Sequence, residues 1–218
     1  RLDQSSRAVT DSVTALAQAA ELAQKIQASP DSLDLYREIV RMFLIAEDLD
    51  SAIAWLQRGR LTSQGRADTS LERQESDLII RRYERISKQL REAITANPAE
   101  AASKDALAKN ESELADFRLK TSIALVERYP NDFSYRHELG TLLLAANRLD
   151  EAVQQLQYAQ RNPKFRQPAL LAIGRAFSQG GKYDLAVEQL TTAKSEVQLM
   201  NDLKKEIIYA LGDTFEKM

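Results

Sequence analysis

The sequence contains no cysteine and a single histidine, His137. Without cysteine the chain has no disulfide bond, no thiolate metal site and no cysteine nucleophile. With one histidine it cannot build a metal site from several histidine ligands, and a Ser-His-Asp triad would have to use His137. These absences leave the compartment undetermined: the cytoplasm is slightly favoured, and the periplasm stays open.

Residues that form turns are also scarce, with only 7 glycines and 5 prolines among 218 residues. Because a β-rich fold of this length needs many turns, the scarcity favours an all-α chain. The longest apolar runs, such as 42–46 and 142–146, are far shorter than the about 20 residues of a membrane-spanning helix. We therefore expect no direct insertion into a membrane.

Neither sign of charge is in clear excess, since 30 basic and 32 acidic residues give a formal net charge of −2. Binding to nucleic acid or to an anionic membrane draws on a positive field, which this chain lacks as a whole. We expect no nucleic-acid partner.

What the sequence does contain is an internal repeat. Three pairs of small residues recur with one spacing of 34 residues: Gly140 and Gly174, Ala152 and Ala186, Ala159 and Ala193. Small residues let two helices approach closely, and a leucine four residues after each first alanine lies on the same helix face. Each unit is predicted to be two short helices that bury their shared face only by stacking on neighbouring units.

This pattern resembles the tetratricopeptide repeat (TPR). The best match has Leu139, Gly140, Leu143, Ala152, Leu156, Ala159 and Pro163, and the next has Leu170, Ile173, Gly174, Phe177, Ala186, Leu190 and Ala193. An upstream match has Tyr36, Ile39, Phe43, Ala52, Leu56 and Gly59, and a fourth begins with Ile208, Leu211, Gly212 and Phe215. The resemblance implies an all-α, right-handed solenoid of about ten helices.

We expect one TPR-like solenoid over residues 1–218, and both ends look like interior cuts of a longer helical array. Its predicted parts are a capping or upstream second helix (8–28), a TPR-like unit (33–66), an elongated hairpin (67–132), a TPR unit (133–166), a TPR unit with four extra residues (167–204) and the first helix of a truncated unit (205–218).

Residues 67–132 lack the repeat pattern and hold a single turn signal, Asn97-Pro98. We therefore predict two long helices, about 69–96 and 99–129. Apolar residues spaced like a heptad predict an antiparallel seam: Ile79, Tyr83, Ile86, Leu90 and Ala93 against Leu107, Leu114, Phe117, Thr121 and Ala124. The hairpin is either an elongated ordinary repeat or a projecting arm used for a partner or for dimerisation.

Helix starts are predicted from capping patterns. Ser29-Pro30, Asn97-Pro98 and Asn162-Pro163 each resemble an N-cap followed by proline in the first turn. Thr69 with Glu72 resembles a capping box, and Pro168 is expected between helices rather than inside one.

No catalytic, metal or cofactor motif is present, so we predict a protein that is not an enzyme and uses no cofactor. The resemblance implies that the first helix of each unit lines a concave wall. The candidate peptide-binding residues on that wall are Arg37, Arg41, His137, Thr141, Leu171, Arg175 and Gln179, and the last helix would add Glu206, Tyr209 and Asp213.

Arg37 and Arg41 lie four residues apart on one predicted helix face, so they could bind the carboxylates of an acidic peptide. The alternative is that both are ordinary solvated arginines. The resulting functional hypothesis is a non-catalytic scaffold whose partner is a protein or peptide. The alternatives are an oligomerisation module that uses the hairpin and a regulatory fragment of a larger enzyme or sensor.

Overall fold

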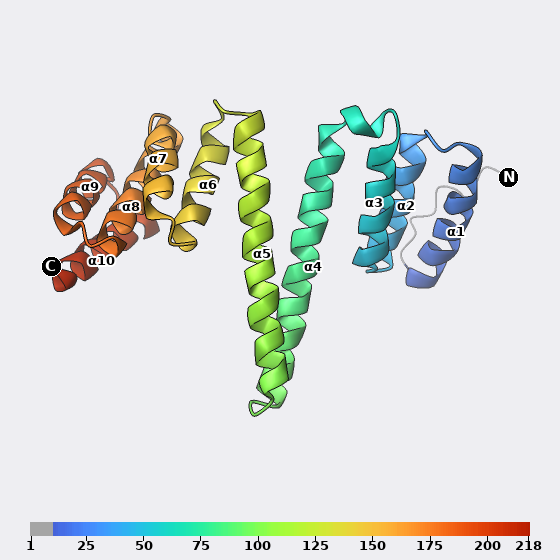
Figure 1. The fold of residues 1–218 in the computed structure, drawn as a ribbon, viewed down its shortest axis with the longest axis horizontal. Helices are drawn as coiled ribbons and strands as arrows, with labels where there is room; N and C mark the ends of the chain where they lie inside the picture. The colour runs from blue at the N-terminus through green and yellow to red at the C-terminus, as the bar shows by residue number, and fades with distance from the viewer. Residues whose placement is uncertain (1–10) are drawn as a thin grey trace. The chain divides into compact units, whose positions relative to one another are not determined.

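A computed structural model describes residues 11–218, which form ten α-helices, one short 3-10 helix and no strand (Figure 1). The predicted all-α fold is confirmed. The chain divides into two compact units, Arg1–Glu111 and Ser112–Met218, so the boundary falls inside one long helix.

The first unit is a series of antiparallel helices, in which α1 packs on α2, α2 on α3, and α3 on the next helix. Its elements are α1 (Ser12–Ala28), α2 (Leu33–Ile45), α3 (Leu49–Leu61), η1 (Gly65–Ala67), α4 (Thr69–Ala96) and the beginning of α5 (Ala101–Arg128). The fully buried Ile39 and Met42 face α1, and Val40 faces α3 and α4.

The second unit continues from Ser112 in α5 through two complete helix pairs and one further helix. Its elements after α5 are α6 (Phe133–Ala145), α7 (Leu149–Ala159), α8 (Pro163–Gln179), α9 (Tyr183–Glu196) and α10 (Asp202–Lys217). Ala152, Ala159, Ala186 and Ala193 are fully buried between these helices.

The glycines of the repeat allow the closest helix contacts. A Cβ atom added at Gly140 would lie 2.6 Å from Cγ of Leu156, and one added at Gly174 would lie 2.5 Å from Cγ of Leu190. In both pairs the leucine of the second helix fills the space left by the glycine of the first. The resemblance to TPR packing is confirmed by this repeated contact.

The two helices of each pair are joined by the same turn three times. In the turn after α6, the amide of Arg148 donates to the carbonyl of Leu143 and the amide of Asn147 to that of Leu144. The turns after α2 and α8 repeat this Schellman pattern. Its left-handed position is held by Glu47, Asn147 and Gly181, whose φ angles are 57°, 57° and 72°.

The two long helices of the predicted hairpin are present as α4 and α5. Figure 1 shows α4 running alongside α3 and then past its end. Arg82 pairs with Asp50 at 3.2 Å, and Arg85 donates to the carbonyl oxygen of Glu47 at 2.7 Å, next to the first turn of α3. The part of α4 after Arg85 therefore extends beyond α3.

The contact between the distal parts of α4 and α5 includes a buried polar pair. Asn110 is 7% exposed, and its side-chain amide donates to the carbonyl of Tyr83 and to Oγ of Ser87, each at 2.9 Å. Ser87 is 3% exposed. Neither residue was in the predicted seam, of whose members Leu114 is buried and Ile86, Leu90 and Leu107 are half-buried.

Only one of the three predicted proline caps is correct, since Asn162 caps α8 with Pro163 in its first turn. Ser29 instead ends α1, where its amide hydrogen-bonds the last turn, and Asn97 likewise ends α4. The sequence Asn97-Pro98 therefore marks the turn of the hairpin.

Two further predictions at helix starts were wrong. Asp68, not Thr69, caps α4, because its carboxylate accepts the backbone amide of Ser70. Pro168 lies inside α8, because the helix already starts at Pro163, which places Pro168 in its second turn.

The hydrogen bond from the Ser70 hydroxyl is the main cause that lowers the pKa of the Asp68 carboxyl. The Ser134 hydroxyl lowers the pKa of Asp132, at the start of α6, in the same way.

The last predicted close-packing glycine, Gly212, has no such contact. A Cβ atom there would meet nothing within 4 Å, and the nearby Phe215 side chain is 59% exposed. The reason is that no second helix packs on this face of α10 among the described residues.

The four extra residues predicted for the unit 167–204 lie in the connection 197–201 between α9 and α10, where Leu199 and Met200 are exposed.

Candidate binding surface

The candidate surface of the second unit is the row of first helices. Helix α6 contacts α8, and α8 contacts α10, whereas the second helices α7 and α9 lie farther apart. Elements that are closer on one side than on the other form a curved stack, with the closer elements on the inner side. The first helices therefore form the inner side of this unit.

On α6 the candidate residues are His137 and Thr141, both half-buried. The His137 ring stacks on Phe165 with their centroids 5.4 Å apart, and its Nε2 is buried without a hydrogen-bond partner among the described residues. Burial lowers the pKa of His137 below its usual value of 6.5, so the ring is neutral at pH 7. The hydroxyl of Thr141 donates back to the carbonyl of Glu138.

On α8 the three candidates differ in accessibility. Leu171 is 4% exposed and packs in the core formed with α9 and α10, so it is not accessible to a peptide. Arg175 is half-buried and pairs with Glu206 of α10 at 3.0 Å. Gln179 is exposed near the end of the helix.

On α10 the most accessible aromatic residue is Tyr209, whose side chain is 78% exposed. Asp213 is not a free acceptor, because Lys217 pairs with it at 2.7 Å. The row of first helices thus presents hydroxyl, amide and aromatic groups, together with the ion pairs of Arg175 with Glu206 and of Lys217 with Asp213.

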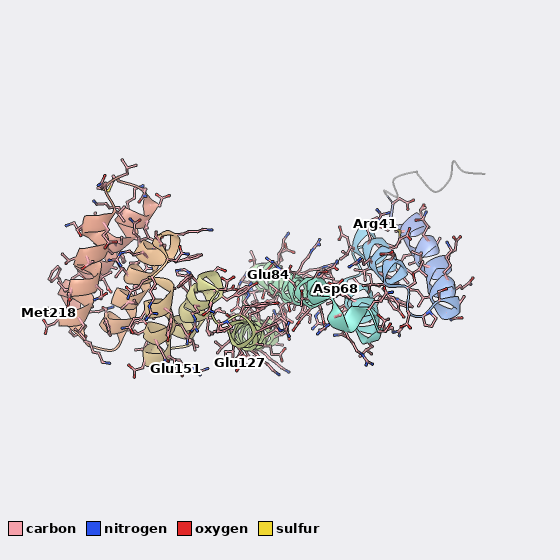
Figure 2. The ribbon with its side chains drawn as sticks, turned by 90° about the horizontal axis from the view of Figure 1, so that it is seen from above. Arg41, Asp68, Glu84, Glu127, Glu151 and Met218 are labelled. Atoms are coloured by element: carbon pink, nitrogen blue, oxygen red, sulfur yellow. The ribbon has the colours of Figure 1, made fainter. Side chains whose placement is uncertain are left out.

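The two arginines of α2, in the first unit, have different surroundings. The Arg37 guanidinium forms ion pairs with Asp68 at 2.6 Å and with Asp34 at 3.5 Å, so two carboxylates of the chain already bind it. Arg41 is exposed and has no carboxylate partner among the described residues. Figure 2 labels Arg41 on α2 and Asp68 at the start of α4. Of the two arginines, only Arg41 is therefore free to bind a new anion.

Sequence reasoning missed the partners of two candidates. Asp68 stands 31 residues after Arg37, and Phe165 stands 28 residues after His137, in each case on the next first helix or just before it. The repeat spacing could have suggested these neighbours, because equivalent positions of successive first helices are separated by about one repeat length.

Among residues 11–218, no group of three or more His, Asp or Glu side chains is arranged to hold a metal ion. No helix in that part of the chain is long and apolar enough to cross a membrane.

The class of protein defined by this packing is an all-α helical-repeat protein with TPR-like helix pairs. No family model matches the chain, and no curated protein matches it. Among solved structures, the chain is similar to that of YrrB, "a TPR protein with an unusual peptide-binding site". The two are 17% identical, with a TM-score of 0.48, and the match covers 92% of this chain and 100% of the other. The fold described above follows from the packing of this chain's own helices.

Proposed function

We propose that the protein is a non-catalytic interaction scaffold whose second unit binds a peptide or protein segment along the inner faces of α6, α8 and α10. The observation that carries the proposal is the direct contact of α8 with both α6 and α10. A row of adjacent helices offers an extended surface, and an extended segment can contact several of them in turn.

The residues proposed to contact the segment are Thr141, Arg175, Gln179 and Tyr209, with His137 at one end. Tyr209 supplies a large exposed aromatic group, a type enriched at interfaces. The buried Leu171 is left out, since it stabilises the stack and does not reach the surface. In the first unit, Arg41 is a separate candidate for an acidic group.

The test is a selection of peptides from a random display library on the purified chain, followed by affinity measurements for the selected peptides. Gln179→Arg and Thr141→Arg add a bulky cation to the inner surface, so we expect each to weaken binding about tenfold or more. The matched control is Gln157→Arg, which changes an exposed glutamine on α7 in the same way.

Equal losses in Gln179→Arg and Gln157→Arg would place the binding elsewhere and contradict the proposal. The same would follow if the library yielded no peptide at all.

The hairpin as a dimerisation arm has less support. Among residues 11–218, the large hydrophobic side chains that are exposed lie outside α4 and α5. A stable dimer interface draws much of its energy from such groups.

A further inference from the structure

Tyr158, on the second helix α7, has two arginines on its ring. The guanidinium carbon of Arg136 lies 4.3 Å from the ring centroid and that of Arg161 lies 4.6 Å from it, while the tyrosine side chain is 40% exposed. The two guanidinium carbons therefore lie within about 9 Å of each other, which is close to the distance at which physiological salt screens exposed charges.

No carboxylate of the described residues balances this pair of charges. Arg136 donates from Nε to the carbonyl oxygen of Pro130 at 2.6 Å and from Nη1 to Oε1 of Gln155 at 2.8 Å, and both acceptors are neutral. Arg161 is exposed and forms no ion pair within the described part of the chain. By contrast, Arg148 and Arg166 of the same unit each bind a glutamate.

The two arginines offer complementary donors. Arg136 is fixed by its two hydrogen bonds and keeps its Nη2 group for a ligand, whereas Arg161 keeps the whole guanidinium fork. A fork of this kind binds a carboxylate through two parallel hydrogen bonds. Because Arg136 is already held in place, less side-chain entropy is lost when a ligand binds.

An aromatic surface adjoins the arginines. The rings of Tyr129 and Tyr135 are 5.7 Å apart, and Tyr129 is 38% exposed. Arg136 connects this pair to the cluster, because it follows Tyr135 in the chain and holds the carbonyl of Pro130, next to Tyr129. A ligand here would meet cations and an apolar surface together.

We propose that Arg136, Tyr158 and Arg161 form a binding site for an acidic segment of a partner protein, in which the arginines bind an Asp or Glu carboxylate and the tyrosines contact a neighbouring apolar side chain. Tyr158 is on α7 and Arg161 follows the end of that helix, while Arg136 reaches them from the first turn of α6. The next residue, His137, stacks on Phe165 of α8 instead, so the site lies on the side of α6 that meets α7 and is distinct from the surface proposed above. A nucleic-acid strand fits less well, since the chain's net charge of −2 provides no extended positive track for its phosphates.

The test uses a fluorescein-labelled peptide of alternating Glu-Glu-Asp and Leu, its Gln-Gln-Asn counterpart, and a labelled oligouridine. Binding to the chain is followed by fluorescence anisotropy at low and at physiological salt. We expect the acidic peptide to bind more tightly than either of the other two probes.

Arg161→Gln should weaken binding of the acidic peptide about fivefold. The double variant Arg136→Gln with Arg161→Gln should weaken its binding more than about tenfold. Arg148→Gln is the matched control, since it removes one positive charge that already has a glutamate partner, and it should change binding less than about twofold. Circular dichroism confirms folding, and Arg161→Gln alone tests the site if the double variant is unstable.

Equal effects of Arg161→Gln and Arg148→Gln would show a response to net charge only and overturn the proposal. Tighter binding of the oligouridine, or equal binding of the acidic and neutral peptides, would overturn it as well. Gln179→Arg should leave the acidic peptide unaffected, which separates this site from the inner surface.

Discussion

At the scale of the residue, a glycine and a leucine determine how closely two helices pack. Gly140 and Gly174 leave room for Leu156 and Leu190, and the same repeat position at Gly212 is open. The sequence predicted Gly140 and Gly174 as packing residues from their spacing of 34 residues, and Gly212 from its place in the TPR-like pattern. Spacing identifies the position in a repeat, but whether that position is filled depends on which helix lies opposite.

Alanine substitution at these glycines should therefore give opposite effects. Gly140→Ala and Gly174→Ala should each lower the free energy of unfolding by about 1–3 kcal/mol, because the new methyl group overlaps a leucine Cγ. Gly212→Ala should raise it by about 0.5–1 kcal/mol, because alanine favours the helix and nothing blocks its side chain. Urea unfolding measures all three, and a loss at Gly212→Ala equal to that at Gly174→Ala would contradict this packing.

The stacked His137 should make stability depend on pH. Because burial lowers its pKa in the folded state, the unfolded chain binds more protons below the usual histidine pKa of 6.5, and stability falls as the pH drops through that value. The capping carboxyls of Asp48, Asp68 and Asp132 have lowered pKa values, so their stabilising effect is lost only at more acidic pH.

Urea unfolding of the wild type and of His137→Phe at about pH 7.5 and about pH 5.5 isolates the histidine. Phenylalanine can still stack on Phe165 but does not titrate. We expect the wild type to lose more stability than the variant over this interval. An identical loss in both proteins would show that His137 does not cause it.

At the scale of the element, the hairpin of α4 and α5 shows what sequence can and cannot predict. Its two long helices followed from one turn signal at Asn97-Pro98 and from the absence of others, and the predicted bounds of the first helix match α4. The buried Ser87 and Asn110 were missed, because a search for apolar periodicity passes over polar side chains. Such residues are buried only because they satisfy each other across the two helices.

Asn110→Ala removes two hydrogen bonds and leaves the Ser87 hydroxyl without its side-chain partner in a buried position. We expect it to lower the free energy of unfolding by about 1–3 kcal/mol. Replacing both residues, with Ser87→Ala and Asn110→Leu, should recover part of that loss, since no buried polar side chain is then left unpaired. Chemical denaturation of the two variants checks this, and an Asn110→Ala protein as stable as the wild type would refute it.

At the scale of the whole molecule, the helical-repeat architecture was predictable and the state of its surface was not. Composition and the spacing of small residues predicted an all-α chain of paired helices, and the resemblance to the tetratricopeptide repeat implied how the pairs stack. The ion pair of Arg37 with Asp68 and the burial of Leu171 depend on how successive helices meet, so local patterns did not reveal them. The prediction of the binding surface consequently needed more correction than the prediction of the fold.

The inner side of the second unit, formed by α6, α8 and α10, is the peptide-binding surface that we propose. Amide chemical-shift mapping of the isotope-labelled chain, with a peptide selected from the library, locates the bound peptide residue by residue. We expect the largest shifts on the exposed faces of these three helices, around Thr141, Gln179 and Tyr209. Shifts concentrated on the outer faces of α7 and α9 would contradict the proposal.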